Sequence, residues 1–145
     1  HVGARGENIV VIFINNTVYG MTGGQMAPTT LIGQVTQTTP FGRDSQLAGN
    51  PIRVCEMMAT LSGTALAQRV AVDTVPHIRE TKKAIRKAFE NQKEKRGLSI
   101  VEVLSTCPTN WGLSPIDAIK RLQDEMIPYY PLGVYKDITA EGGNK

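Results

Sequence analysis

The apolar positions of this chain fall into short blocks that predict alternating strands and helices. An unbroken β-branched run from Ile9 to Ile14 does not alternate with polar residues, so it predicts a strand buried on both faces. Shorter apolar blocks at 68–72 and 98–104 predict two further strands. Capping residues and apolar spacings predict three helices, over residues 50–63, 73–96 and 114–126.

This order of elements predicts an α/β layered fold with a largely parallel sheet, formed by one domain over residues 1–145. In such sheets, ligands bind in the loops beyond the carboxyl ends of the strands. The loops after Ile14 and after Leu104 occupy such places, and they hold the most unusual sequences of the chain. The Pro- and Tyr-rich segment from Pro128 is expected to dock on a neighbour or to fray.

Composition narrows the class of protein. The 145 residues are 41% hydrophobic and 20% charged, which is ordinary for a soluble domain. No apolar run approaches the roughly 20 residues of a membrane span, and no secretion signal is visible at the start. Two cysteines, Cys55 and Cys107, are too few for a disulfide framework, so a cytoplasmic location is expected.

The loop after the first strand has the composition of a phosphate and metal site. Its glycines allow the backbone N–H groups to turn toward an anion, and Asn16 offers an amide oxygen of the kind that Mg²⁺ accepts. A diphosphate with Mg²⁺ would fit this composition. A glycine-rich turn without any ligand fits it equally well.

The residues of this loop carry a resemblance to a known family. The run Asn-Asn-x-Val-Tyr-Gly-Met-Thr-Gly-Gly-Gln-x-x-Pro-Thr, from Asn15 to Thr29, resembles the thiamine-diphosphate loop of the β subunit of 2-oxoacid:ferredoxin oxidoreductases. The spacing of His1 and Arg5 before Asn16 and the ending at 129–136 resemble the same family. The resemblance covers nearly the whole chain and is weakest between about Thr36 and Arg96.

The resemblance implies a thiamine-diphosphate-binding fold and a set of site residues. Asn16 matches the side-chain ligand of Mg²⁺, and Val18 matches the residue whose backbone carbonyl is a second ligand. Tyr19 either lines the pocket or packs to hold the loop, and His1 is a candidate catalytic residue near the cofactor. The residues matching the turn along the diphosphate are Gly20, Met21 and Thr22, with Gly23 and Gly24 shaping the same turn.

The loop after the third strand holds the second chemical candidate. Its segment Cys107-Pro-Thr-Asn-Trp111 resembles the family segment that supplies a distant fourth cysteine to a [4Fe–4S] cluster, which implies that Cys107 is a ligand. Cys55 lies in an apolar block and is expected to be a core residue. Trp111 is expected to cap the core.

The sequence also departs from the family pattern. Fifteen residues precede Asn16, and they contain neither the Gly-Asp-Gly motif, whose Asp is a Mg²⁺ ligand, nor the Cys-x-x-Cys pair of the cluster. We therefore expect the C-terminal portion of a β subunit, with the fold incomplete at its N-terminus and little cofactor binding by this chain alone.

The implied reaction is the CoA-dependent oxidative decarboxylation of a 2-oxoacid to an acyl-CoA, with reduction of ferredoxin. The implied partners are the α and other subunits of a hetero-oligomer. The ending favours the 2-oxoglutarate and branched-chain (2-ketoisovalerate) members without deciding between them. The alternative is a non-catalytic fragment or assembly module that keeps the fold without cofactor.

Charge adds one more candidate surface. The net charge is +3, and the stretch from Arg79 to Arg96 holds eight basic and three acidic residues. A solvated helix face is the favoured interpretation over nucleic-acid binding, because acids are interspersed and no aromatic residue is interleaved for stacking on bases. Ile85 and Phe89 are expected to turn one face of the helix toward a core. A docking patch for an acidic ferredoxin, with Lys82, Lys83 and Lys87, is a third hypothesis.

Overall fold

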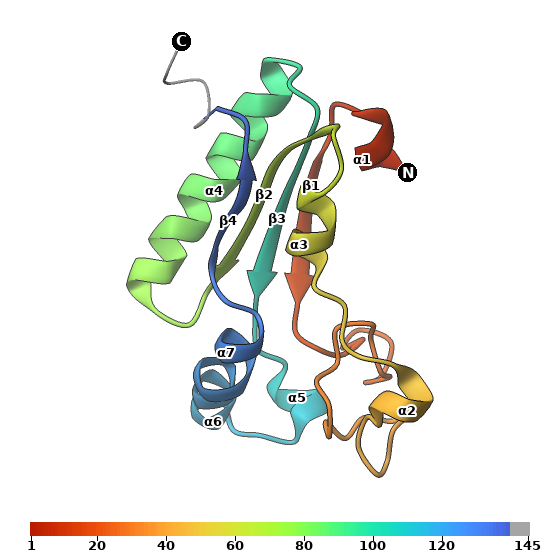
Figure 1. The fold of residues 1–145 in the computed structure, drawn as a ribbon. Helices are drawn as coiled ribbons and strands as arrows, with labels where there is room; N and C mark the ends of the chain where they lie inside the picture. Colours follow the sequence, from red (N-terminus) through yellow and green to blue (C-terminus); the bar gives the residue numbers. More distant parts are fainter. Residues whose placement is uncertain (140–145) are drawn as a thin grey trace.

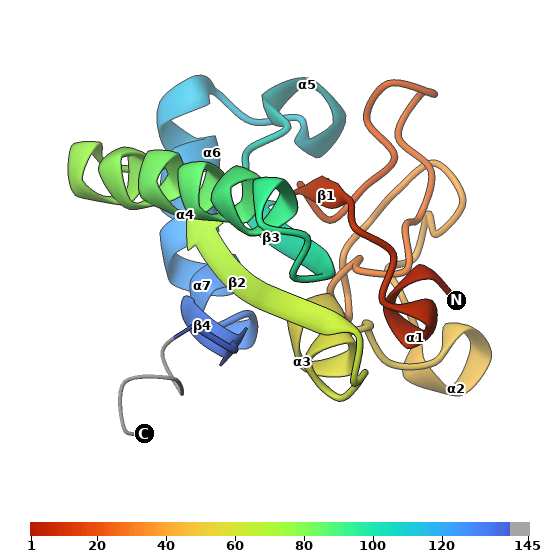
Figure 2. The same ribbon diagram turned by 90° about the horizontal axis from the view of Figure 1, so that it is seen from above.

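The protein forms a layered α/β structure around one four-stranded sheet. The computed structural model describes residues 1–139. The strands β1 (Val10–Asn15), β3 (Leu98–Leu104) and β2 (Thr64–Ala71) are parallel neighbours, and β4 (Gly133–Asp137) pairs antiparallel with β2 at one edge. The long helix α4 covers one face of the sheet, and α3 covers the other (Figures 1 and 2). The predicted fold class is therefore confirmed.

Helix α4 (Val75–Lys93) and strand β3 follow the sequence prediction closely. The side chain of Thr74 caps α4 by accepting a hydrogen bond from the backbone N–H of His77, and Pro76 lies in the first turn. Ala84 and Ala88 are buried against the sheet, beside Leu66 and Val101. Small residues at this spacing let the helix approach the strands closely, which fixes the α4 layer.

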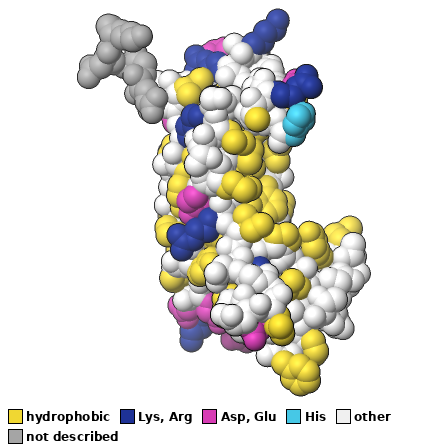
Figure 3. Space-filling model, turned by 45° about the vertical axis from the view of Figure 1, so that its right-hand side comes forward, with side chains coloured by type: hydrophobic (Ala, Val, Ile, Leu, Met, Phe, Trp, Pro, Cys, Tyr) yellow, Lys and Arg dark blue, Asp and Glu magenta, His cyan; other side chains and the backbone are white. Residues whose placement is uncertain are grey.

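Strand β1 lies at the edge of the sheet, and one of its two faces is exposed among the described residues. The prediction that it is buried on both faces is therefore wrong for this chain. The strand pairs only with β3, and the side chains of Ile12 and Ile14 are 37% and 54% exposed. Exposed apolar side chains continue around it at Ile52, Met57 and Phe89, and Figure 3 shows hydrophobic side chains gathered along the middle of one side of the molecule. A continuous apolar pattern is typical of an inner strand that is covered on both faces. In β1 the described residues leave the face with Ile12 and Ile14 partly open.

The helix predicted over residues 50–63 is much shorter than expected. Helix α3 is limited to Val54–Ala59, Cys55 is its only buried residue, and Met57 is 51% exposed. The preceding segment is held extended by tertiary hydrogen bonds, from the N–H of Ile52 to the Pro28 carbonyl and from Arg43 to the Asn50 carbonyl. These contacts override the local preference of Asn50-Pro51 for a helix start.

The long connection between β1 and α3 is ordered around one buried arginine. It contains only one short helix, α2 (Ser45–Ala48). The guanidinium of Arg43 is buried and donates to six backbone carbonyls, which belong to residues 27, 28, 30, 48, 49 and 50. One side chain thus replaces the ladder of hydrogen bonds that regular structure would provide, and this explains why the segment shows no periodicity.

The C-terminal part packs on the sheet edge and on the first loop. Ser114 caps α6 (Pro115–Arg121) as predicted, and the helix continues through the wider turn η1 (Leu122–Met126) into α7 (Ile127–Tyr129). The Pro- and Tyr-rich segment docks: Tyr130 is fully buried, and its hydroxyl donates to the Thr29 carbonyl at 2.8 Å. Strand β4 was not predicted, because its block of apolar residues is too short to show a period.

The basic residues of α4 face solvent, but part of their charge is already paired. Lys83 pairs with Glu80 and Lys87 pairs with Asp137 of β4. Phe89 is 49% exposed, so it packs into the core less than expected. These pairs leave Lys82 as the one candidate docking lysine without an ion pair among the described residues. No helix within residues 1–139 has both the length and the apolar character needed to span a membrane.

Candidate functional site

The two loops singled out in the sequence meet at the carboxyl ends of β1 and β3. These strands are parallel neighbours, with Asn15 opposite Leu104, so the chain leaves both strands at the same edge of the sheet (Figure 1). Two hydrogen bonds join the loops: the indole N–H of Trp111 donates to the Asn16 carbonyl at 3.2 Å, and the Asn110 amide donates to the Gly20 carbonyl at 3.0 Å. The two donor residues, Asn110 and Trp111, both lie in the short helix α5 (Pro108–Trp111).

The turn directly after β1 is held in a strained conformation. Thr17 is fully buried with a φ of 57°, a region that costs a threonine about 1–3 kcal/mol. Its N–H donates to the Asn15 side chain at 3.1 Å, and its carbonyl accepts from Thr30 at 2.6 Å and from Gln34 at 3.0 Å. These contacts hold the left-handed residue in place and fix the directions of its neighbours, Asn16 and Val18.

The two predicted Mg²⁺ ligands carry oxygens that no other group uses. Within residues 1–139, the side-chain amide of Asn16 makes no hydrogen bond, and the backbone carbonyl of Val18 accepts none. The Thr17 hydroxyl between them is buried and has no partner there either. Mg²⁺ typically takes one or two protein oxygens and completes its shell with phosphate oxygens and water. The residues present therefore fit a Mg²⁺ ion that is shared with a phosphate.

The glycine turn offers backbone donors beside these oxygens. A bridge between Tyr19 and Gln25 closes the turn, and the Gly24 N–H donates to the Tyr19 carbonyl at 2.8 Å. The N–H groups of Gly20, Met21 and Thr22 donate to nothing within the described residues. Consecutive free N–H groups in a glycine turn form a concavity that binds anions. The geometry thus supports the assignment of this turn to a diphosphate.

Cys107 lies against the same turn. It is a free, partly exposed thiol at the start of α5, and its Sγ accepts a hydrogen bond from the Asn110 amide at 3.2 Å. A Cβ at Gly20 would lie 3.0 Å from that sulfur, so the glycine makes room for it. An accessible sulfur that already accepts an N–H bond suits a thiolate ligand. Around this sulfur, as elsewhere in residues 1–139, no three His, Cys, Asp or Glu side chains gather as a metal site.

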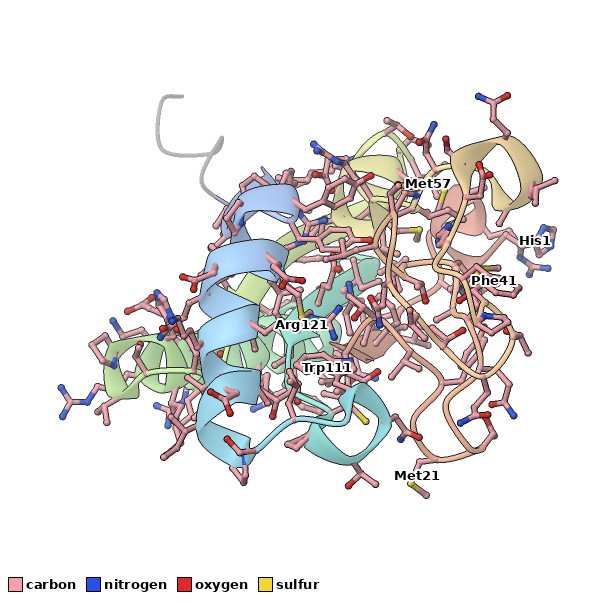
Figure 4. All side chains as sticks on the ribbon, turned by 90° about the horizontal axis from the view of Figure 1, so that it is seen from below. His1, Met21, Phe41, Met57, Trp111 and Arg121 are labelled. Carbon is pink, nitrogen blue, oxygen red and sulfur yellow. The ribbon has the colours of Figure 1, made fainter. Side chains whose placement is uncertain are left out.

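The other residues singled out in the sequence are His1, Tyr19 and Trp111, and the structure gives the position of each. His1 precedes α1 (Val2–Arg5) at the opposite end of β1, so the expectation that it lies near the cofactor loop is wrong (Figures 1 and 4). Tyr19 is 52% exposed and lines an apolar hollow of about 300 Å³ together with Asn16 and Val18. Trp111 packs on the core as expected, and Arg121 stacks 4.6 Å from its ring (Figure 4).

A buried ion network lies beneath the site. Arg69 of β2 and Glu102 of β3 are both fully buried and pair at 2.9 Å, and Glu102 also accepts from the Asn15 amide at 2.7 Å. Arg69 pairs in addition with Glu56 of α3. Burial alone would raise the pKa of Glu56, but hydrogen bonds from Arg69 hold that pKa below its usual range. The network links β1, β3 and β2 directly below the first loop.

Cys55 lies at this network and is chemically inert. It is fully buried, and burial raises the pKa of its thiol, with the charge of Glu102 raising it further. The group therefore stays protonated, and its interpretation as a core residue agrees with its place. Sequence reasoning gave no role to Asn110, Thr17 or Arg43, although Asn110 lies inside the quoted Cys-Pro-x-Asn-Trp segment.

The comparison with known protein families agrees with this geometry. The family described as thiamine pyrophosphate enzyme, C-terminal TPP binding domain, matches residues 1–103. The chain belongs to this family. Its match includes the β1 loop with Asn16, Val18 and the glycine turn, so the resemblance to a thiamine-diphosphate-binding family is confirmed.

Curated relatives of this chain are named as subunits of oxidoreductases and of a 2-oxoacid synthase. The chain is 46% identical over 137 residues to the ketoisovalerate oxidoreductase subunit VorA of Methanothermobacter thermautotrophicus, covering 94% of this chain and 29% of the relative. It is 34% identical over 146 residues to the 2-oxoglutarate synthase subunit KorB of Methanocaldococcus jannaschii, covering 97% of this chain and 48% of the relative. The chain thus spans less than half of the length of these relatives.

A solved structure shares the fold. The 2-oxoglutarate:ferredoxin oxidoreductase from Magnetococcus marinus, with 2-oxoglutarate, coenzyme A and succinyl-CoA bound, superposes with a TM-score of 0.67 at 21% identity. The match covers 94% of this chain and 50% of the other chain. At this identity the likeness supports the fold.

Proposed function

We propose that this chain is the thiamine-diphosphate-binding portion of the β-type subunit of a 2-oxoacid:ferredoxin oxidoreductase. The observation that carries the proposal is the contact between the glycine turn and a partly exposed cysteine, Cys107, next to oxygens of Asn16 and Val18. Within residues 1–139 these oxygens and the N–H groups of the turn have no hydrogen-bond partner. Curated relatives named as a ketoisovalerate oxidoreductase subunit and a 2-oxoglutarate synthase subunit support the same reaction class.

The overall reaction converts a 2-oxoacid and CoA to an acyl-CoA and CO₂. Two electrons pass to two oxidised ferredoxin molecules, and the thiol hydrogen of CoA is released as a proton. Bound thiamine diphosphate supplies the carbon nucleophile that this decarboxylation needs, while the protein binds and orients it. Further subunits of a hetero-oligomer would complete the pocket for CoA and substrate.

Each loop residue has a binding role in this proposal. The Asn16 side chain and the Val18 carbonyl would hold Mg²⁺, and the N–H groups of Gly20, Met21 and Thr22 would hold the diphosphate, with Gly23 and Gly24 shaping the turn. The hydrogen bonds that hold Thr17 in its left-handed conformation would keep the two oxygens in place before the cofactor arrives. Preorganised ligands avoid the entropic cost of ordering the loop on binding.

Cys107 would be one ligand of a [4Fe–4S] cluster, with the other ligands supplied from outside residues 1–139. Replacing Cys107 with serine in the intact complex is expected to abolish or convert the cluster, measured as loss of its iron content and of its EPR signal on reduction. Cys55→Ala is the control, because the buried thiol of Cys55 faces the core. A Cys107→Ser complex with an unchanged cluster would show that the cluster ligand lies elsewhere.

The two candidate substrates are 2-oxoglutarate and a branched-chain 2-oxoacid such as 2-ketoisovalerate. The test is an anaerobic assay of the intact complex, with CoA-dependent viologen reduction measured over a panel of 2-oxoacids. Reduction with one substrate, lost when thiamine diphosphate is omitted, supports the proposal and names the substrate. A complex that holds the cofactor and a cluster but reduces viologen with none of them contradicts the reaction.

A further inference from the structure

The side chain of Asn110 reaches across the junction between the two loops. Its Nδ2 donates to the Gly20 carbonyl at 3.0 Å and to Cys107 Sγ at 3.2 Å. An amide nitrogen carries two hydrogens, so both bonds form at once. Since a carbonyl oxygen only accepts hydrogen bonds, the nitrogen of the amide must be the atom that faces the Gly20 carbonyl.

The oxygen end of the same amide packs against the far end of the turn. A Cβ at Gly24 would lie 2.6 Å from Asn110 Oδ1, and Gly24 has a φ of 91° that other residues rarely adopt. Asn110 is thus enclosed by Gly20, Gly24 and Cys107. This one side chain thus touches the turn at both ends and the sulfur as well.

We propose that Asn110 is a positioning residue that holds the Gly20–Gly24 turn against Cys107 and tunes the cluster that Cys107 ligates. The inference rests on the proposed function. An N–H bond to a ligating sulfur withdraws electron density from it, which stabilises the reduced, more negative cluster. The same amide fixes the backbone that binds the diphosphate, so one residue serves both groups.

The test uses Asn110→Ala and Asn110→Asp in the intact complex, with Thr109→Ala as the matched control. Thr109 is exposed in the same turn of α5, and its side chain makes no hydrogen bond within residues 1–139. The first readout is the midpoint potential of the cluster, from an EPR-monitored redox titration. The second is the dissociation constant of thiamine diphosphate with Mg²⁺, measured without turnover.

The expected potential is more negative in Asn110→Ala than in the wild type. It is more negative still in Asn110→Asp, because a carboxylate adds negative charge beside the sulfur. The dissociation constant is expected to rise about tenfold in both variants, a typical cost of losing a supporting hydrogen bond at a metal site. Thr109→Ala should keep both wild-type values. A purely structural role would not order the two potentials by the charge at residue 110.

The inference is overturned if either Asn110 variant, with cluster and cofactor bound, shows both the wild-type midpoint potential and the wild-type dissociation constant for thiamine diphosphate. If both variants assemble but lose the cluster while Thr109→Ala keeps it, Asn110 is needed to hold Cys107, which supports the positioning role. Failure of the proposed function appears separately, in a complex with native Asn110. A cluster whose iron content and EPR signal are unchanged in Cys107→Ser refutes the ligand assignment and this inference together, before any Asn110 variant is made.

Discussion

Replacing Asn16 with alanine is expected to weaken Mg²⁺-dependent binding of thiamine diphosphate to the intact complex by roughly 100-fold or more. Removing a residue that only hydrogen-bonds to a metal ligand already lowers metal affinity by about 10–100-fold. Asn16 would be a direct ligand, so a larger loss is expected. Its side-chain amide makes no hydrogen bond within the described residues, so its removal breaks no hydrogen bond of the fold there. Cofactor-dependent viologen reduction should fall in parallel when thiamine diphosphate is limiting.

The control for this experiment is Asn50→Ala. Asn50 is exposed, and only its backbone carbonyl takes part in a hydrogen bond, from Arg43. Isothermal titration of thiamine diphosphate with Mg²⁺ into each complex measures the effect. If Asn16→Ala bound the cofactor as tightly as Asn50→Ala, Asn16 would not be a ligand, and the Mg²⁺ site would have to be placed elsewhere.

Replacing Arg69 with methionine is expected to reduce the free energy of unfolding by about 3–5 kcal/mol. The side chains of Arg69 and Glu102 are both fully buried, so the substitution leaves the Glu102 carboxylate in the core without its cation. Glu56 loses its Arg69 hydrogen bonds in the same step. Urea unfolding followed by circular dichroism gives the difference in free energy.

Two further variants identify the cause of that loss. Arg53→Met should change the free energy of unfolding by less than about 1 kcal/mol, because Arg53 is half-exposed and lies 3.9 Å from Glu56. The double variant Arg69→Met with Glu102→Gln should recover much of the stability, since it removes the unpaired charge and keeps an acceptor for Asn15. A double variant no more stable than Arg69→Met would mean that packing of Arg69 matters more than charge.

The sequence determined the elements whose hydrogen bonds and apolar pattern are local. Helix α4 begins directly after Thr74 and helix α6 directly after Ser114, because each of these caps accepts a hydrogen bond from the N–H three residues ahead. Strand β3 is buried along its whole length, over the same residues that were predicted. The loop motif with Asn16 and the segment with Cys107 were also recognisable, because both are short and continuous in the sequence.

Tertiary structure decided what depends on distant residues. Helix α3 is short because Arg43 and Pro28 hold the segment before it extended, and the edge position of β1 follows from which strands pair. Strand β4 forms because β2 offers it an open edge. The hydrogen bond from Asn110 to the Gly20 carbonyl spans 90 positions of the chain, so no local pattern could show it. The sequence alone determined the chemistry of each loop, and only the folded sheet, with neighbouring parallel strands ending at one edge, brought the two loops into one site.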